Sequence, residues 1–338
     1  MGRIKKYLTG FMLATATIGL LAGCGNEGAP ANDTGGGGDD ELLIYGIYKA
    51  GDQTWFIDEG NAARAQTEEM GGSFVFVDAE MSSEVVLTAI DNAIANNASG
   101  VLICIPDQVM SQVVVDRLTE AGIPVIAVDD PLIDDAGEKI APWVGIDGYT
   151  IGYANGQWLA EYILEHGIEN LEGLGVMLLT MDTVSSTVPR IDGAVDAFLN
   201  VLPNFDQSLF FRADHDGTTE RGNVQATAVI TANPQITHWM ILSANEEAAI
   251  GAVRALETAG IDQNAAVVGL GGYLAYDEWL RNPDVAMRSA AFFSAEDIGR
   301  TSARFLIEYI RYGTEVPWET AISATMVTPD NFREIMGD

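Results

Sequence analysis

The sequence predicts an α/β fold made of two doubly wound lobes, each with a parallel β-sheet covered by helices. Short runs of apolar and β-branched residues alternate with stretches whose apolar residues recur at helical spacing. The strand-like runs lack polar alternation, which is typical of strands covered on both faces. Strand–helix repeats of about thirty residues are typical of βαβ units and parallel sheets. The chain has too many such strands for one compact sheet, so we expect two.

The expected strands follow one another from residue 42 onward. In order they are Leu42–Tyr48, Ser73–Asp78, Val101–Ile105, Pro124–Asp129, Leu174–Thr180, Ser208–Ala213, His238–Ala244 and Ala265–Gly271. Helical patterns between them include Val85–Ile94, Val109–Leu118 and Ile151–Ile163. We place the break between the lobes near Ile146–Gly148, which leaves roughly four or five strands for each lobe.

The composition excludes several classes of protein. The chain has 17 Lys and Arg against 49 Asp and Glu, a net charge of −32. Such an acidic chain repels phosphate backbones and anionic lipid headgroups, so we expect no nucleic-acid partner and no direct binding to a lipid surface. Apolar residues make up 48% of the chain, which is enough for packed cores.

The first 23 residues have the pattern of a secretory signal peptide. Three basic residues precede the apolar run Phe11–Ala22, which is short for a transmembrane helix and makes a retained helix the weaker alternative. Cys24 directly follows Leu-Ala-Gly, and this ending resembles the lipobox of bacterial lipoproteins. The resemblance implies that Cys24 becomes a lipid-modified N-terminus. An ordinary signal peptide that ends near a cysteine is the alternative.

Two further expectations concern the segment after the signal peptide and the second cysteine. Residues 24–41 are rich in glycine and nearly free of apolar side chains, so we expect a flexible tether. Cys104 lies in the run Val101–Ile105, which predicts a buried strand residue. With Cys24 lipidated, Cys104 has no disulfide partner, and apolar surroundings would raise its pKa and make it a poor nucleophile.

Polar and aromatic side chains gather directly after the predicted strands. They are Lys49, Trp55, Phe56, Asp129, Asp130, Ser185, Ser186, Arg190, Asn245 and Glu246. Sheets of this type bind ligands outside the carboxyl ends of their strands. Charged groups hydrogen-bond strongly to hydroxyls, and an indole stacks on the C–H face of a sugar ring. The set therefore suits a neutral polyhydroxyl ligand.

Six stretches together resemble the periplasmic L-arabinose-binding proteins of bacterial sugar uptake systems. They are Lys49–Phe56, Val101–Asp107, Val125–Asp130, His238–Asn245, Gly251–Ala255 and Thr328–Phe332. The resemblance implies the type I periplasmic binding fold, in which three crossovers join two α/β lobes that close over a monosaccharide. It implies a first lobe of residues 42–147 plus about 294–318, and a second lobe of residues 148–293 plus about 319–338.

The resemblance also implies ligand contacts in the first lobe. Lys49 matches the family's ligand-contacting lysine, and Gln53 stands where the family has a glutamate. Trp55-Phe56 matches an aromatic pair near the sugar. Asp129-Asp130 matches a pair of aspartates whose second member hydrogen-bonds the sugar. In the second lobe Ser186 and Arg190 match a threonine and an arginine, and Asn245 matches an asparagine.

The sequence departs from the family at four positions around the same site. Ile146, at the crossover between the lobes, and Ala244 replace methionines. Gly271 and Leu274 stand where the family has an asparagine and an aspartate that contact the ligand. A sugar-type ligand is therefore better supported than L-arabinose itself. We expect Gly271→Asn combined with Leu274→Asp to improve L-arabinose binding.

Each candidate residue also has a purely structural interpretation. Asp129-Asp130 could form an Asx turn, Trp55 could be a core residue at a helix entry, and Arg190 could make a surface ion pair. Asn245 is a good N-cap for a helix over Glu246–Leu256, a role compatible with ligand contact.

Motifs for catalysis or cofactor binding do not occur. The acidic segment at residues 214–220 lacks the spacing of a calcium loop, and there is no dinucleotide fingerprint, phosphate-binding loop or nucleophile elbow. We therefore expect no metal, no cofactor and no enzyme activity.

Together these observations predict a lipid-anchored receptor outside the cytoplasm, at the cell surface or in the periplasm. It would bind L-arabinose or a related aldose by hinge closure and deliver it to an ABC permease and its ATPase. We expect a monomer whose only contact with the membrane is its N-terminal lipid. The alternative is the same fold presenting its ligand to a chemoreceptor or a sensor kinase.

Overall fold

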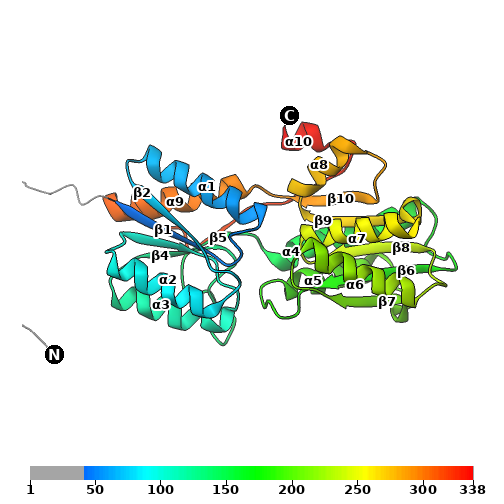
Figure 1. The fold of residues 1–338 in the computed structure, drawn as a ribbon, viewed down its shortest axis with the longest axis horizontal. Helices are drawn as coiled ribbons and strands as arrows, with labels where there is room; N and C mark the ends of the chain where they lie inside the picture. The colour runs from blue at the N-terminus through cyan, green and yellow to red at the C-terminus, as the bar shows by residue number, and fades with distance from the viewer. Residues whose placement is uncertain (1–41, 338) are drawn as a thin grey trace, which may run out of the picture. The chain divides into compact units, whose positions relative to one another are not determined.

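The computed structural model describes residues 42–337, in which strands and helices alternate along most of the chain (Figure 1). The predicted signal peptide of residues 1–23, the proposed lipidation site Cys24 and the predicted tether of residues 24–41 lie outside the described residues. Within residues 42–337, no helix combines the length and the apolar character needed to cross a membrane.

The first lobe is built on a six-stranded parallel sheet. In spatial order its strands are β11 (Glu319–Ala321), β5 (Trp143–Gly145), β4 (Val125–Asp129), β3 (Gly100–Ile103), β1 (Leu43–Tyr48) and β2 (Ser73–Asp78). One face packs against α1 (Thr54–Glu69) and α9 (Ala295–Tyr312), and the other against α2 (Ser83–Ala95) and α3 (Ser111–Glu120) (Figure 1). Both faces are apolar because helices cover both of them.

The second lobe repeats this plan with its own six-stranded sheet. In spatial order its strands are β12 (Thr325–Val327), β10 (Met287–Phe292), β9 (Ala265–Gly271), β8 (His238–Ser243), β6 (Leu174–Thr180) and β7 (Phe210–Asp214). The two cores include residues of α4 (Gly148–Glu165) and α5 (Val188–Val201) on one face, and of α6 (Thr219–Ala232), α7 (Glu246–Ala259), α8 (Tyr273–Arg281) and α10 (Phe332–Met336) on the other. β12 runs antiparallel to β10, so this sheet is parallel except at that edge.

The chain crosses between the two sheets three times, as the resemblance implied. The crossings lie between β5 and α4, between β10 and α9, and between β11 and β12. Because β11 pairs with β5, residues 319–321 belong to the first sheet. The last crossing therefore follows Ala321 and does not begin at about residue 319.

Most of the predicted strands are found within a residue or two of their expected bounds. Three of them have the predicted bounds, namely Ser73–Asp78, Leu174–Thr180 and Ala265–Gly271. The strand expected over Ser208–Ala213 begins at Phe210, because Gln207–Leu209 forms a 3-10 turn. The Asp206 carboxylate caps this turn by accepting from the backbone amide of Ser208. The prediction missed β5, β10, β11 and β12, three of which have only three residues.

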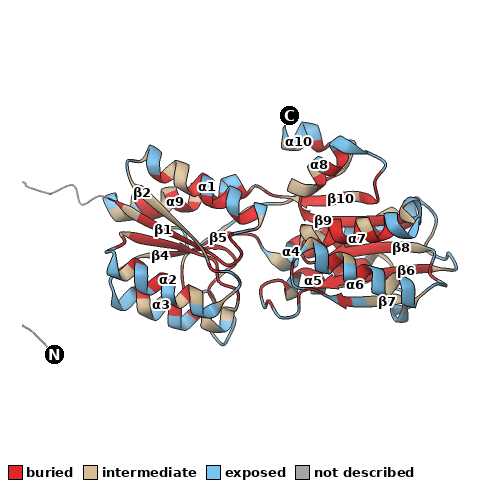
Figure 2. Cartoon of the chain, in the orientation of Figure 1, coloured by how far each residue is buried: buried red, intermediate tan, exposed pale blue. Residues whose placement is uncertain are grey.

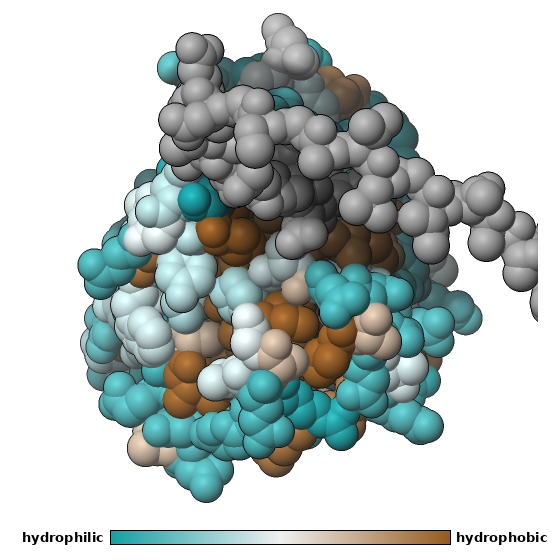
Figure 3. Space-filling model, turned by 90° about the vertical axis from the view of Figure 1, so that its left-hand side faces the viewer, coloured by the Kyte–Doolittle hydropathy of each residue, from teal (hydrophilic) through white to brown (hydrophobic). Residues whose placement is uncertain are grey.

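Burial follows the three-layer arrangement of each lobe, with helices on both faces of the sheet. The strands of both sheets are largely buried, and the helices carry one buried and one exposed side (Figure 2). In α9, for example, Ile298 and Leu306 are buried whereas Glu296 and Asp297 are exposed. On the side of the molecule seen in Figure 3, hydrophilic side chains cover much of the surface, with hydrophobic patches between them.

Helices α4 and α5 approach each other closely at two glycines. A Cβ on Gly152 would lie 1.8 Å from the carbonyl oxygen of Arg190, and one on Gly156 would lie 1.9 Å from that of Ala194. Such distances are far below any van der Waals contact, so only glycine permits this packing. The close approach fixes the first turn of α5, which carries Arg190.

Candidate functional site

A cavity lies between the two lobes at the carboxyl ends of their strands. Its first-lobe wall consists of Lys49, Ala50, Gln53, Trp55, Phe56, Met81 and Asp129. Its second-lobe wall consists of Met181, Thr187, Arg190, Asn245, Glu247, Leu270 and Tyr273, with Ile146 and Phe293 at the crossovers. Eight of the ten expected ligand-binding residues therefore line one cavity. The other two, Asp130 and Ser186, are bonded to Lys49 beside it.

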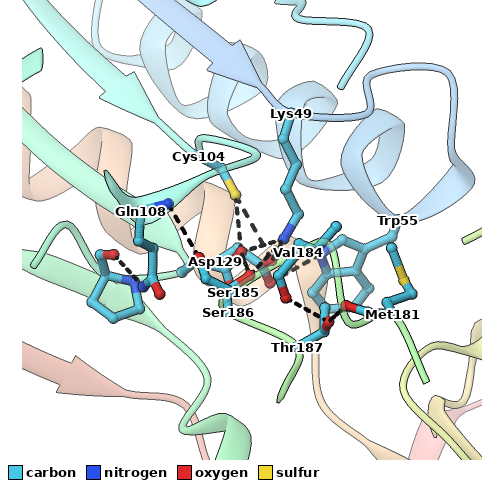
Figure 4. A network of polar contacts seen from close by, with 12 residues as sticks. Lys49, Trp55, Cys104, Gln108, Asp129, Met181, Val184, Ser185, Ser186 and Thr187 are labelled. Carbon is cyan, nitrogen blue, oxygen red and sulfur yellow. Dashed lines mark hydrogen bonds and ion pairs between the residues drawn. The ribbon is translucent and has the colours of Figure 1, made fainter. Parts of the chain in front are cut away.

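Lys49, Asp130 and Ser186 form a buried network that joins the two lobes. Figure 4 shows Lys49 and Ser186 close together within the surrounding polar contacts. The Lys49 ammonium donates to the Asp130 carboxylate and, at 3.3 Å, to the Ser186 hydroxyl. That hydroxyl donates to Asp130 Oδ2 at 2.7 Å, and the Arg190 guanidinium lies 3.7 Å from Asp130 Oδ1. Burial alone would raise the pKa of Asp130, but the charges of Lys49 and Arg190 outweigh it and hold the pKa below its ordinary value.

Asp129 ends β4 in a strained conformation and faces the cavity. Its φ is +59°, which residues with a side chain rarely adopt. Its carboxylate accepts from the Trp55 indole at 3.2 Å, and its carbonyl oxygen accepts from the Trp143 indole at 3.1 Å. Burial and the charge of Asp130 raise the pKa of Asp129 to about 6. Trp55 therefore has a polar partner at the site, and both aspartates contact distant segments.

Arg190 is buried, so the alternative of a surface ion pair is wrong. Its NH1 donates to the Ala244 carbonyl oxygen at 2.9 Å, which anchors the guanidinium beside the cavity.

Two further expected contacts lie in the first lobe. The Phe56 ring centroid lies 5.7 Å from Lys49 Nζ. Gln53 occupies the N-cap position of α1 without a side-chain capping bond.

Asn245 is the N-cap of α7, as expected. Its Oδ1 accepts from the Ala248 amide at 3.2 Å. Its Nδ2 donates to the Gly217 carbonyl oxygen at 2.7 Å and to Glu247 Oε2 at 2.8 Å. Both N–H groups are thus used within the protein, so a ligand can be served only by the remaining lone pair of Oδ1.

Cys104 lies in surroundings that differ from the expected apolar strand. It follows the end of β3, and its Sγ lies 3.6 Å from Asp130 Oδ2 and 4.0 Å from Asp129 Oδ2. Burial raises the pKa of the thiol well above its usual range; Lys49 opposes this shift and the two carboxylates add to it. Three potential metal ligands meet here, but the Lys49 ammonium already supplies the positive charge at Asp130.

Sequence reasoning missed Tyr273 and Glu247, which add a hydroxyl and a carboxylate to the polar groups of the second-lobe wall. The Tyr273 hydroxyl donates to Glu247 Oε1 at 2.7 Å. The Tyr273 and Trp55 rings face each other from different lobes with centroids 5.8 Å apart. The available signal was their position, since Glu247 lies two residues after Asn245 and Tyr273 lies two residues after Gly271.

The expected gain in L-arabinose binding from Gly271→Asn combined with Leu274→Asp stays a prediction, and the structure shows what each substitution would meet. Gly271 has a φ of +116°, and a Cβ there would lie 2.5 Å from the Tyr273 ring. Leu274 packs against the core of the second lobe and lines a neighbouring pocket between the lobes, which shares Gln53 and Glu247 with the cavity described above. An asparagine at position 271 would therefore displace the Tyr273 ring, whereas an aspartate at position 274 would face the neighbouring pocket.

Comparison with known proteins assigns the chain to a family. A model of the periplasmic binding protein domain matches residues 44–315. The chain belongs to this family. This periplasmic binding protein is 29% identical to the ABC transporter L-arabinose-binding periplasmic protein of Azospirillum brasilense, over 99% of this chain and 98% of that one. It is 26% identical to the L-arabinose-binding periplasmic protein of Escherichia coli (strain K12), over 96% of each.

Solved structures agree with the type I periplasmic binding fold. A periplasmic solute-binding protein of Actinobacillus succinogenes 130z with bound D-allose has a TM-score of 0.74 and 22% identity, covering 87% of this chain and 100% of that one. The binding component of the arabinose ABC transporter of Shewanella sp. ANA-3 has a TM-score of 0.73 and 18% identity, covering 87% and 94%. These relatives are binding proteins, in agreement with the expectation that this periplasmic binding protein is not an enzyme.

Proposed function

We propose that this chain is the extracytoplasmic sugar receptor of an ABC importer and binds L-arabinose or a related aldose between its lobes. The observation that carries the proposal is the buried group of Lys49, Asp130 and Arg190 beside the Trp55 indole at the interlobe cavity. Such a group offers charged hydrogen-bonding partners to hydroxyls and an aromatic surface to a sugar ring. Two L-arabinose-binding relatives of matching length support the choice of ligand.

The proposed ligand contacts come from both lobes. They are Lys49, Gln53, Trp55, Phe56, Asp129, Asp130, Ile146, Ser186, Arg190 and Asn245. Contacts between the lobes beside the cavity suggest how binding drives hinge closure, since Lys49 reaches Ser186 and the Gln108 backbone amide donates to Ser185 Oγ at 3.2 Å. A ligand stabilises the closed form by the contacts that it makes only when both lobes meet it. The permease and its ATPase would then receive the sugar from the closed receptor.

A sugar ligand is expected to raise the melting temperature of the purified protein. A ligand that binds only the folded chain adds about 2.7 kcal/mol of stability when its concentration is about a hundred times Kd. Thermal-shift measurements with a set of neutral aldoses test this, with amino acids and short peptides as controls. If only the amino acids or peptides raise the melting temperature, the proposed function is wrong.

We further propose that a lipid on Cys24 anchors the receptor outside the cytoplasm. The support is the basic and apolar pattern of residues 1–23 and the cysteine directly after Leu-Ala-Gly. Metabolic labelling with a palmitate analogue is expected to mark the full-length protein but not Cys24→Ala. Cys104→Ala removes the other cysteine and should keep the label. Labelling that persists in Cys24→Ala would contradict the lipid anchor.

A further inference from the structure

The end of β9 is shaped by two glycines and by the tyrosine that follows them. Gly271 and Gly272 have φ values of +116° and +83°, a region that favours glycine. Because a Cβ on Gly271 would lie 2.5 Å from the Tyr273 ring, this ring fills the space that a side chain at position 271 would need. The turn thus places an aromatic ring in the second-lobe wall of the cavity.

Two neighbouring glutamates have different tasks at this turn. Glu246 is fully buried, and its carboxylate accepts from the backbone amides of Gly272 at 2.8 Å and Leu274 at 2.7 Å. Glu247 lines the cavity and accepts from the Tyr273 hydroxyl at 2.7 Å. Glu246 therefore fixes the backbone of the turn, whereas Glu247 and the tyrosine hydroxyl bring polar oxygens to the cavity.

The Glu247 carboxylate keeps hydrogen-bonding capacity for a ligand. An ionised carboxylate has about four lone-pair sites, of which the Tyr273 hydroxyl and the Asn245 amide each use one. The Tyr273 ring lies opposite Trp55 of the first lobe, with ring centroids 5.8 Å apart. The second lobe therefore offers an acceptor for hydroxyl groups and an aromatic surface for C–H groups at the same point.

We propose that Tyr273 and Glu247 form the principal second-lobe ligand contact and set the preference of this receptor among sugars. The inference rests on the proposed sugar-binding function and deepens it. The preferred ligand is a neutral aldose with a hydroxyl that donates to Glu247. A sugar acid or sugar phosphate is disfavoured, because the Lys49 and Arg190 cations in the walls are already paired with Asp130, whereas Glu247 and Asp129 would repel an anion.

Calorimetry with L-arabinose, D-ribose, D-galactose and D-galacturonate tests this assignment. Glu247→Gln is expected to weaken binding of the preferred neutral sugar by about 10- to 100-fold, and Tyr273→Phe by about 3- to 10-fold. Both variants should change the order of preference among the sugars, and Glu247→Gln should narrow the gap between D-galactose and D-galacturonate. Tyr276→Phe is the matched control, because that ring packs against Phe332 away from the cavity.

The possible outcomes separate this assignment from the function on which it rests. If Glu247→Gln and Tyr273→Phe keep the affinities and the order of preference of the parent while Asp130→Ala loses sugar binding, the assignment is wrong and the sugar-binding function stands. If the parent binds none of the four compounds, both are wrong. A changed order of preference with an unchanged melting temperature of the ligand-free protein supports a direct role in recognition.

Discussion

Replacing Asp130 by alanine is expected to weaken sugar binding by roughly 30- to 1000-fold, or about 2–4 kcal/mol. The carboxylate holds Lys49, Ser186 and Arg190 together, so its removal leaves two buried cations without their shared partner. Calorimetry with the aldose that gives the largest thermal shift measures the loss. Asp91→Ala is the matched control, since Asp91 pairs with Arg117 on the surface and should change affinity little.

The same variant has a second readout in its pH dependence. The pKa of Asp130 is lower in the folded protein than in the unfolded chain. The ionised carboxylate therefore contributes its full stability above the unfolded pKa of about 3.9. This stability is lost as the pH falls through the folded pKa. The difference in stability between parent and Asp130→Ala is therefore expected to narrow at acid pH. If Asp130→Ala binds every sugar as tightly as the parent, the proposed site at the strand ends is wrong.

Replacing Gly152 by alanine is expected to destabilise the second lobe by about 1–3 kcal/mol and to weaken sugar binding as well. The new Cβ would lie 1.8 Å from the Arg190 carbonyl oxygen, so α4 and α5 must separate. This movement would shift the guanidinium away from Asp130, because Arg190 lies in the first turn of α5. Thermal or chemical denaturation measures the loss of stability, and calorimetry measures the loss of affinity.

Gly148→Ala is the matched control on the same helix. A Cβ at this position would lie 3.4 Å from Arg190 Cγ, which is ordinary contact, so the expected change in stability is within about 0.5 kcal/mol. Equal melting temperatures for Gly152→Ala and the parent would show that the α4–α5 contact adapts easily. The position of Arg190 would then not depend on these glycines.

The sequence predicted four neighbouring strands of each sheet and missed the two at one side, which are β11 and β5 in the first sheet and β12 and β10 in the second. β6 and β9 are buried along their whole length, so a continuous apolar run marks them clearly. In β11 the first and third residues are exposed and the second is half-buried, so no apolar run marks this strand. β5 begins directly after a proline. Their pairing is decided by contacts with distant segments, which no local pattern records.

The same distinction applies to the site. Lys49 and Asp130 were predictable because they follow the ends of parallel strands, where the two lobes present their side chains. Tyr273 was not predictable in this way. Its place depends on the left-handed conformation of Gly271 and on the bonds from the Gly272 and Leu274 amides to a buried glutamate. A comparison made position by position shows only that the side chain at position 271 is absent. It does not show that the Tyr273 ring occupies the space of that side chain.

The third crossing has a consequence for the order in which the molecule is built. The first sheet takes its central strands from the beginning of the chain, but its edge strand β11 and its covering helix α9 from the end. Gly299 of α9 packs against the backbone of Glu59 in α1, so neither helix is complete in its packing alone. Contacts between such distant residues form slowly, because a long loop must close first. Neither lobe can therefore be completed until nearly the whole chain is made, because β12 and α10 of the second lobe follow β11 in the sequence.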